Sequence, residues 1–129
     1  MRRMTERATR SACVVAGATP DEVKPLAGQL DVQLRANRLG TLITGGPDGL
    51  PIDCAAELPG PVYDVMYDAR TGWFAVTVYR GMTQPSRWDN RPGTDAGYPR
   101  LDDVLGQATP RAILEALDVP ADAIGYLAS

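Results

Sequence analysis

The chain has 129 residues, a formal net charge of −3, an apolar fraction of 44% and no histidine. This length predicts a single domain that buries a core without metal or disulfide support, and this apolar content is ordinary for a globular protein. The lack of histidine excludes Ser–His and Cys–His nucleophile pairs and histidine-ligated metals.

The N-terminal segment is basic. Its first ten residues hold one glutamate and four arginines, which are Arg2, Arg3, Arg7 and Arg10. We expect residues 1–18 to form a mobile arm ahead of one domain spanning 19–129. An arginine arm can contact nucleic acid. Because these ten residues contribute +3 to a total of −3, however, the remainder carries −6, which makes nucleic acid an unlikely main partner.

The pattern Thr19-Pro20-Asp21-Glu22 predicts the start of a helix. Threonine can cap the helix, proline suits its first position, and the glutamate completes a capping box. The residues that follow fit two structures, since their apolar side chains match both a helical stripe and the alternation of a strand. We favour a helix from Pro20 towards Gly40 with a bend at Pro25, and leave residues 28–38 open between helix and strand.

Two hairpins are predicted next. The first spans 41–56, with a short strand at 41–44, a Gly-Pro-Asp-Gly turn and a returning strand at 52–56. The second spans 61–80, where β-branched and aromatic residues alternate with others on both sides of a turn that ends in Gly72. This second hairpin is the clearest structural signal in the sequence.

Residues 81–100 show no periodicity and predict a long loop, and such loops often carry function. The loop holds four residues of types that are enriched at interface hot spots, namely Arg87, Trp88, Arg91 and Tyr98. We predict that these residues bind a protein partner. The alternative is that Trp88 and Tyr98 pack on the sheet and hold the loop in place.

Helices are predicted at the C-terminal end. Thr109-Pro110 repeats the pattern of a capping threonine followed by proline, and an apolar stripe follows over 112–117. Pro120 ends this helix. The predicted fold class is therefore α+β, with a small antiparallel sheet of hairpins 41–56 and 61–80 packed against an N-terminal helix and C-terminal helices.

The order of several short motifs resembles a family of small actinobacterial proteins, of the Streptomyces type, that have no assigned activity. The similarity covers about residues 58–117 and departs from the family at the N-terminus and after Pro120. It implies an α+β fold with a D-x-x-x-G-W hairpin and a closing helix announced by D-V-L and prolines, and it implies no site. The residues that carry it are Leu58-Pro59-Gly60, Asp64-Val65, Asp68, Gly72-Trp73, Tyr98, Asp103-Val104-Leu105, Pro110 and Ala112.

The side chains that could carry chemistry are few. Cys13 and Cys54 are isolated, without the spacing of a zinc site or a disulfide framework, which favours a reduced cytoplasmic protein. Asp64 and Asp68 share one strand face and could hold a hard cation, although a solvated face is the more common role. We predict no metal and no cofactor, and we favour a non-catalytic protein over an enzyme.

The sequence thus favours a regulatory protein-interaction module that binds a protein partner through residues 81–100. One alternative is a small-molecule-binding protein or carboxylate-based enzyme, with a pocket between sheet and helices lined by Tyr63, Asp64 or Asp68. Another is nucleic-acid contact through the arginine arm. An open hairpin edge would permit a homodimer, and no apolar run is long enough to span a membrane.

Overall fold

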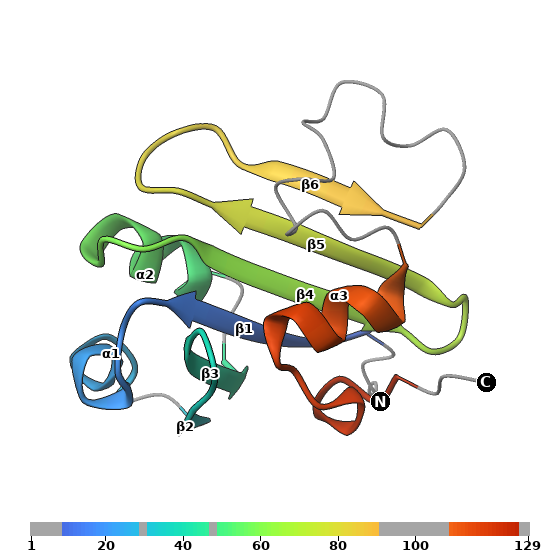
Figure 1. The fold of residues 1–129 in the computed structure, drawn as a ribbon, viewed down its shortest axis with the longest axis horizontal. Helices are drawn as coiled ribbons and strands as arrows, with labels where there is room; N and C mark the ends of the chain where they lie inside the picture. Colours follow the sequence, from blue (N-terminus) through green and yellow to red (C-terminus); the bar gives the residue numbers. More distant parts are fainter. Residues whose placement is uncertain (1–8, 29–30, 47–48, 91–108, 127–129) are drawn as a thin grey trace, which may run out of the picture.

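The centre of the molecule is one sheet of six antiparallel strands (Figure 1). The computed structural model describes residues 9–28, 31–46, 49–90 and 109–126. The strand order across the sheet is β2-β3-β1-β4-β5-β6. The strands are β1 (Thr9–Ala16), β2 (Val32–Ala36), β3 (Gly40–Gly45), β4 (Val62–Asp68), β5 (Trp73–Tyr79) and β6 (Ser86–Asp89).

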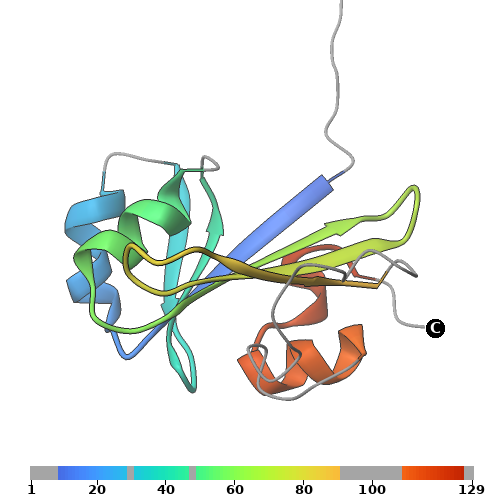
Figure 2. The ribbon, with the colours of Figure 1, turned by 90° about the horizontal axis from the view of Figure 1, so that it is seen from above.

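Helices cover the two faces of the sheet at opposite ends (Figure 2). Helices α1 (Pro20–Ala27) and α2 (Leu50–Glu57) pack on one face. Helix α3 (Pro110–Leu117) and the short 3-10 helix η2 (Ala121–Ala123) lie on the other face. We call these the α1/α2 layer and the α3 layer. The predicted α+β class is confirmed.

Strand β1 lies in the middle of the sheet, between β3 and β4. Its side chains are buried on both faces, with Val14 against the α3 layer and Val15 against the α1/α2 layer. A strand covered on both sides reads as an unbroken apolar run, so the alternation that marks a half-exposed strand is missing. The prediction of a mobile arm over 1–18 is therefore wrong for β1, and residues 1–8 lie outside the described residues.

The predicted hairpin 61–80 is confirmed as β4 and β5. Its strands pair from Val62 with Tyr79 to Asp68 with Trp73. The connecting turn ends in Gly72, which has a positive φ of 76° and donates its N–H to the carbonyl of Asp68 at 2.8 Å. Glycine adopts this backbone conformation without steric cost. The turn that closes the hairpin therefore depends on a glycine that can be recognised in the sequence.

The predicted hairpin 41–56 is correct only in its first strand, β3. Residues 52–56 belong to α2. Pro51 is compatible with this helix because it lies in the first turn, where its missing N–H is not needed. The buried residues of α2 recur at a spacing of four, as a helix against a sheet requires. They are Leu50, Pro51, Cys54 and Ala55.

Strand β3 pairs with β1 on one side and with β2 on the other, so residues 32–36 form a strand. The predicted helix is therefore too long, since α1 ends at Ala27. Its start is confirmed in detail. The backbone N–H of Glu22 donates to the Thr19 hydroxyl at 3.3 Å, and the Thr19 N–H donates to the Glu22 carboxylate at 2.9 Å. Pro25 lies inside this eight-residue helix.

Candidate functional site

The connection between β5 and β6 is an exposed turn. All six residues from Arg80 to Pro85 are exposed. The turn is nonetheless ordered by hydrogen bonds, because the N–H and the hydroxyl of Thr83 both donate to the carbonyl of Arg80, at 3.2 and 2.6 Å. Met82 lies between them and is 88% exposed, more than any other large apolar residue that the structure describes. The fold thus presents a methionine to solvent on a hydrogen-bonded turn.

Residues 86–89 form strand β6, so the predicted structureless loop 81–100 contains a strand. Trp88 lies opposite Val76 in the pairing with β5, and is half-buried on the face of the α3 layer. Its ring meets Phe74 edge to face, with ring centroids 6.3 Å apart. Such pairs add stability beyond their buried area. Trp88 therefore packs on the sheet, as the structural alternative for this residue predicts.

Arg87 lies on the opposite face of β6 from Trp88, because successive side chains of a strand alternate. Its Nε donates to the hydroxyl of Thr77 on β5 at 3.1 Å, and the side chain is half-buried. Thr77 itself is buried. One hydrogen bond thus orients a guanidinium that has further donors to offer.

The end of β6 is fastened to the β4–β5 hairpin by Asn90. Its backbone N–H donates to the carbonyl of Phe74 at 3.1 Å, and its side chain accepts from the Phe74 N–H and donates to the carbonyl of Gly72, both at 3.0 Å. The indole N–H of Trp73 donates to Asp89 at 3.3 Å. These four bonds fix where β6 ends. No local sequence pattern marks the partners of Asn90, so its role could not be predicted.

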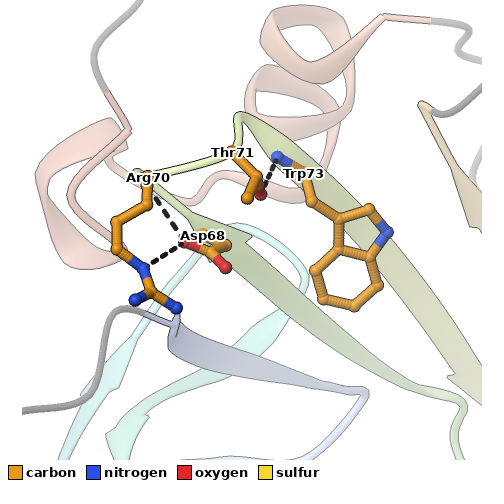
Figure 3. A network of polar contacts seen from close by, with 4 residues as sticks. All are labelled: Asp68, Arg70, Thr71 and Trp73. Carbon is orange, nitrogen blue, oxygen red and sulfur yellow. Dashed lines mark hydrogen bonds and ion pairs between the residues drawn. The ribbon is translucent and has the colours of Figure 1, made fainter.

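Figure 3 shows the neighbouring β4–β5 turn from close by. The Arg70 N–H donates to the Asp68 carboxylate at 3.0 Å, and the Arg70 Nε lies 3.8 Å from the same oxygen. The Trp73 N–H donates to the Thr71 hydroxyl at 3.3 Å, while its indole extends away from the turn. The Asp68 carboxylate therefore stabilises the turn. This is a structural role for one of the two carboxylates that were predicted as possible cation ligands.

Two of the four predicted partner-binding residues lie in β6, and two lie outside the described residues. Arg87 and Trp88 are adjacent on the strand but on opposite faces of the sheet. Arg91 and Tyr98 fall within 91–108, which the structure does not describe. The structure therefore does not join Arg87 and Trp88 into one patch, and places only Arg87 on the face away from the α3 core.

Asp64 lines a small hollow between β1, β4 and the start of α2, together with Ser11, Cys13 and Met66. The hollow has a volume of about 20 Å³, which is room for roughly one water molecule. Pockets for small organic ligands are far larger, on the order of 300–1,000 Å³. Tyr63 lies in the core on the other face, under the α3 layer. The three side chains predicted to line one pocket thus lie in three different places.

The two cysteines are buried and free. Burial raises the pKa of the Cys13 thiol well above its ordinary value, and the Asp64 carboxylate and Cys54 raise it further. Burial and then the Asp53 carboxylate raise the pKa of Cys54 to about 11. Both thiols are therefore protonated at neutral pH, and a buried protonated thiol is a poor nucleophile.

No three potential metal-ligating side chains come together in the parts of the chain that the structure describes. Within those same parts, no helix is both long and apolar enough to cross a bilayer.

A second polar network joins the β2–β3 turn to the end of α3. The side-chain amide of Asn37 donates to the carbonyls of Leu117 and Asp118, at 2.9 and 3.3 Å, and its oxygen accepts from the N–H groups of Leu39 and Gly40. An asparagine three residues before a glycine is a turn signal. The bonds to α3 span about eighty residues of chain, and no local pattern predicts them.

Comparison with protein-family models, with curated proteins and with solved structures finds no match to this chain. The resemblance to small actinobacterial proteins stays a prediction.

Proposed function

We propose that the protein is a non-catalytic interaction module with a regulatory role, and that it binds a protein partner through the segment that begins at Gly81. The observation that carries this proposal is the turn before β6, where Met82 is 88% exposed within a run of six exposed residues. Covering a large apolar side chain that is exposed to water lowers the free energy, so a partner that buries Met82 would bind more tightly.

The local geometry supports Met82 and Arg87 as contacts. Methionine is flexible and polarizable, and it fits partner pockets of different shapes. Arginine offers a planar set of donors that suits carboxylate or carbonyl groups. We therefore expect a partner surface with an apolar pocket for Met82 and hydrogen-bond acceptors for Arg87.

The packing around β6 supports the same proposal in another way. Trp88 on one face and Asn90 at the end hold the strand against β5 before any partner arrives. A binding segment that is ordered in advance loses less conformational entropy on association. In this proposal Trp88 supports the segment, and the residues before it make contact.

The test introduces a photo-crosslinking amino acid at position 82 and, as a matched control, at position 52 on α2. Ile52 is the other exposed large apolar residue that the structure describes, at 52%. We expect one defined crosslinked protein from native host cells at position 82 and none of the same mass at position 52. Met82→Asp should weaken binding of that purified protein roughly tenfold or more, whereas Ile52→Asp should leave it unchanged.

Thermal melts of both variants provide the stability control, because both positions are exposed. Equal crosslinking at the two positions, or equal affinity of the two variants, would contradict the proposal. A Trp88→Ala variant should instead lower the melting temperature, since its ring contacts Phe74 in the core.

A further inference from the structure

Strand β2 is the last strand at one edge of the sheet as far as the described residues extend. Its register with β3 runs from Val32 with Gly45 to Ala36 with Thr41. Beyond Ala36, Asn37 and Gly40 exchange two backbone hydrogen bonds, at 2.9 and 3.2 Å. Since antiparallel residues alternate between bonded and non-bonded pairs, the peptide groups of Val32, Leu34 and Ala36 face away from β3, towards the open edge.

This edge has few of the features that keep strands apart. Natural edge strands are protected by proline, by charged side chains and above all lysine, by bulges or by short length, and β2 holds one charged side chain, Arg35. β2 has five residues in an unbroken register and contains no proline or lysine. Its apolar residues Val32 and Leu34 are only half-buried, against the α1/α2 layer.

Two opposite charges flank the apolar residues. Asp31, just before β2, and Arg35, within it, are both exposed. Arg35 lies on the face opposite to Val32 and Leu34, and continuing the alternation of β2 by one residue puts Asp31 on the same face. In the parts of the chain that the structure describes, the side chain of neither residue has a hydrogen-bond or ion-pair partner.

We propose that a second copy of this chain pairs with the edge of β2, antiparallel and across a two-fold axis at Gln33. In this register Asp31 lies directly opposite Arg35 of the second copy, and by symmetry the pair occurs twice. Val32 lies opposite Leu34 of the second copy, also twice. These two are the residues whose peptide groups face the edge, so the hydrogen-bonding pattern and the side-chain pattern agree.

The neighbouring registers fit less well. Moving the two-fold axis by one residue shifts the pairing register by two residues, and only such shifts keep outward peptide groups opposite one another. An axis at Leu34 places Arg35 opposite Gln33 and leaves Asp31 unpaired, while an axis at Arg35 places two arginines face to face. Opposite charges directly across a strand pair are stabilising, and like charges are destabilising. The axis at Gln33 is therefore favoured, and a second copy supplies the complementary charges that a partner would need.

The resulting dimer joins the two sheets into one continuous sheet and places both α1 helices on the same face, near the axis. The interface is a single strand pair with its flanking side chains, which is small for a stable dimer. We expect a dissociation constant of roughly micromolar order. The β6 segment lies at the opposite edge of the sheet, so this inference does not depend on the function proposed above.

Sedimentation equilibrium at several protein concentrations tests the proposal. The variants are Arg35→Asp, Asp31→Arg and the double variant that carries both changes. Each single change sets like charges opposite one another twice, and should raise the dissociation constant at least about tenfold. The double variant restores opposite charges and should return the constant to near its original value. Arg111→Asp on the exposed side of α3 is the control, because it alters the net charge as Arg35→Asp does.

A second measurement keeps the test independent of the variants. Hydrogen exchange at the Leu34 amide of the unaltered protein should slow as the protein concentration rises, while the Arg35 amide, which faces β3, should be unaffected. A chain that stays monomeric at about 1 mM overturns the proposal and leaves this edge to a strand of another protein. Single variants that dimerise as the unaltered chain does, or a double variant that is not restored, also overturn it.

Discussion

The two layers that cover the sheet fill their cores in different ways. The α3 layer is built from rings, in which Tyr126 meets both Tyr67 and Phe74 edge to face, with centroids 5.0 and 5.8 Å apart. Among the described residues, the α1/α2 layer holds no fully buried aromatic residue, and only the half-buried Tyr79 packs against it. Its buried positions are taken by small and β-branched or aliphatic side chains, among them Cys13, Ala18, Ala27, Cys54 and Ala55.

Backbone segments approach one another most closely at the end of β1. A Cβ atom added at Gly60 would overlap the carbonyl oxygen of Ala16, and one added at Gly40 would overlap that of Val15. The α3 face of the sheet is thus held by large interlocking side chains, and the end of β1 by close contact between main chains. We therefore expect the α3 layer to lose stability when a side chain is removed, and the close backbone contact to lose stability when an atom is added.

The largest effect is expected from Phe74→Ala in the α3 layer. Phe74 is fully buried between Trp88 and Tyr126, so truncation removes two ring contacts and leaves a cavity. We expect a loss of about 3–5 kcal/mol in the free energy of unfolding, measured by urea denaturation. A loss below about 1 kcal/mol would mean that the rings do not hold this layer.

A smaller effect is expected from Gly60→Ala, which adds one methyl group to the close contact with Ala16. Because the obstacle is a backbone oxygen, the chain must shift, and we expect a loss of about 3 kcal/mol, at the upper end for overpacking. Gly49→Ala is the matched control, since nothing lies within 4 Å of an added Cβ there. The same urea titration should separate the two variants, and equal losses would refute the role of close backbone contact at the end of β1.

The smallest effect concerns pH and the thiols of the α1/α2 layer. The pKa of Cys54 in the folded protein is about 11, above the 9.0 of an ordinary thiol. The folded state therefore favours the protonated thiol, and the stability that this adds is complete below pH 9 and is lost as the pH rises towards 11. Two pKa units correspond to about 3 kcal/mol at full ionisation, of which roughly 2 kcal/mol is lost between pH 8 and pH 11.

Urea titrations between pH 8 and 11 should show this decline, and Cys54→Ala should make it shallower. Folded protein should also react with Ellman's reagent far more slowly than unfolded protein at pH 8. Fast modification of the folded chain would show that the α1/α2 layer does not seal its thiols.

How much of the fold can be predicted from the sequence also differs between the layers. The α3 layer could be predicted well, since β4 and β5 alternate clearly and Thr109 caps α3 with a hydrogen bond to the Ala112 N–H at 3.2 Å. In the α1/α2 layer only the capping box of Thr19 could be predicted. Strand β1 lacks alternation because both its faces are covered, and short segments of small apolar residues, such as α2, fit helix and strand equally well.

The candidate site was predicted in part. Residue type alone selected Arg87 and Trp88, but it could not separate the ring that packs on Phe74 from the guanidinium that is bound to Thr77, because that difference depends on the strand register. Met82 was missed because exposure is decided by the turn and not by composition. Asn37 and Asn90 were missed because their hydrogen bonds reach segments distant in the chain.

The central position of β1 has a consequence for synthesis on the ribosome. Both strands that flank β1 are made after it, so its peptide groups have no sheet partner when it leaves the exit tunnel. At a translation rate of roughly 5–20 residues per second, the wait until β4 is complete is about 3–10 s. Until then the apolar run from Ala12 to Ala16 lacks the pairing with β4 that it has in the folded sheet.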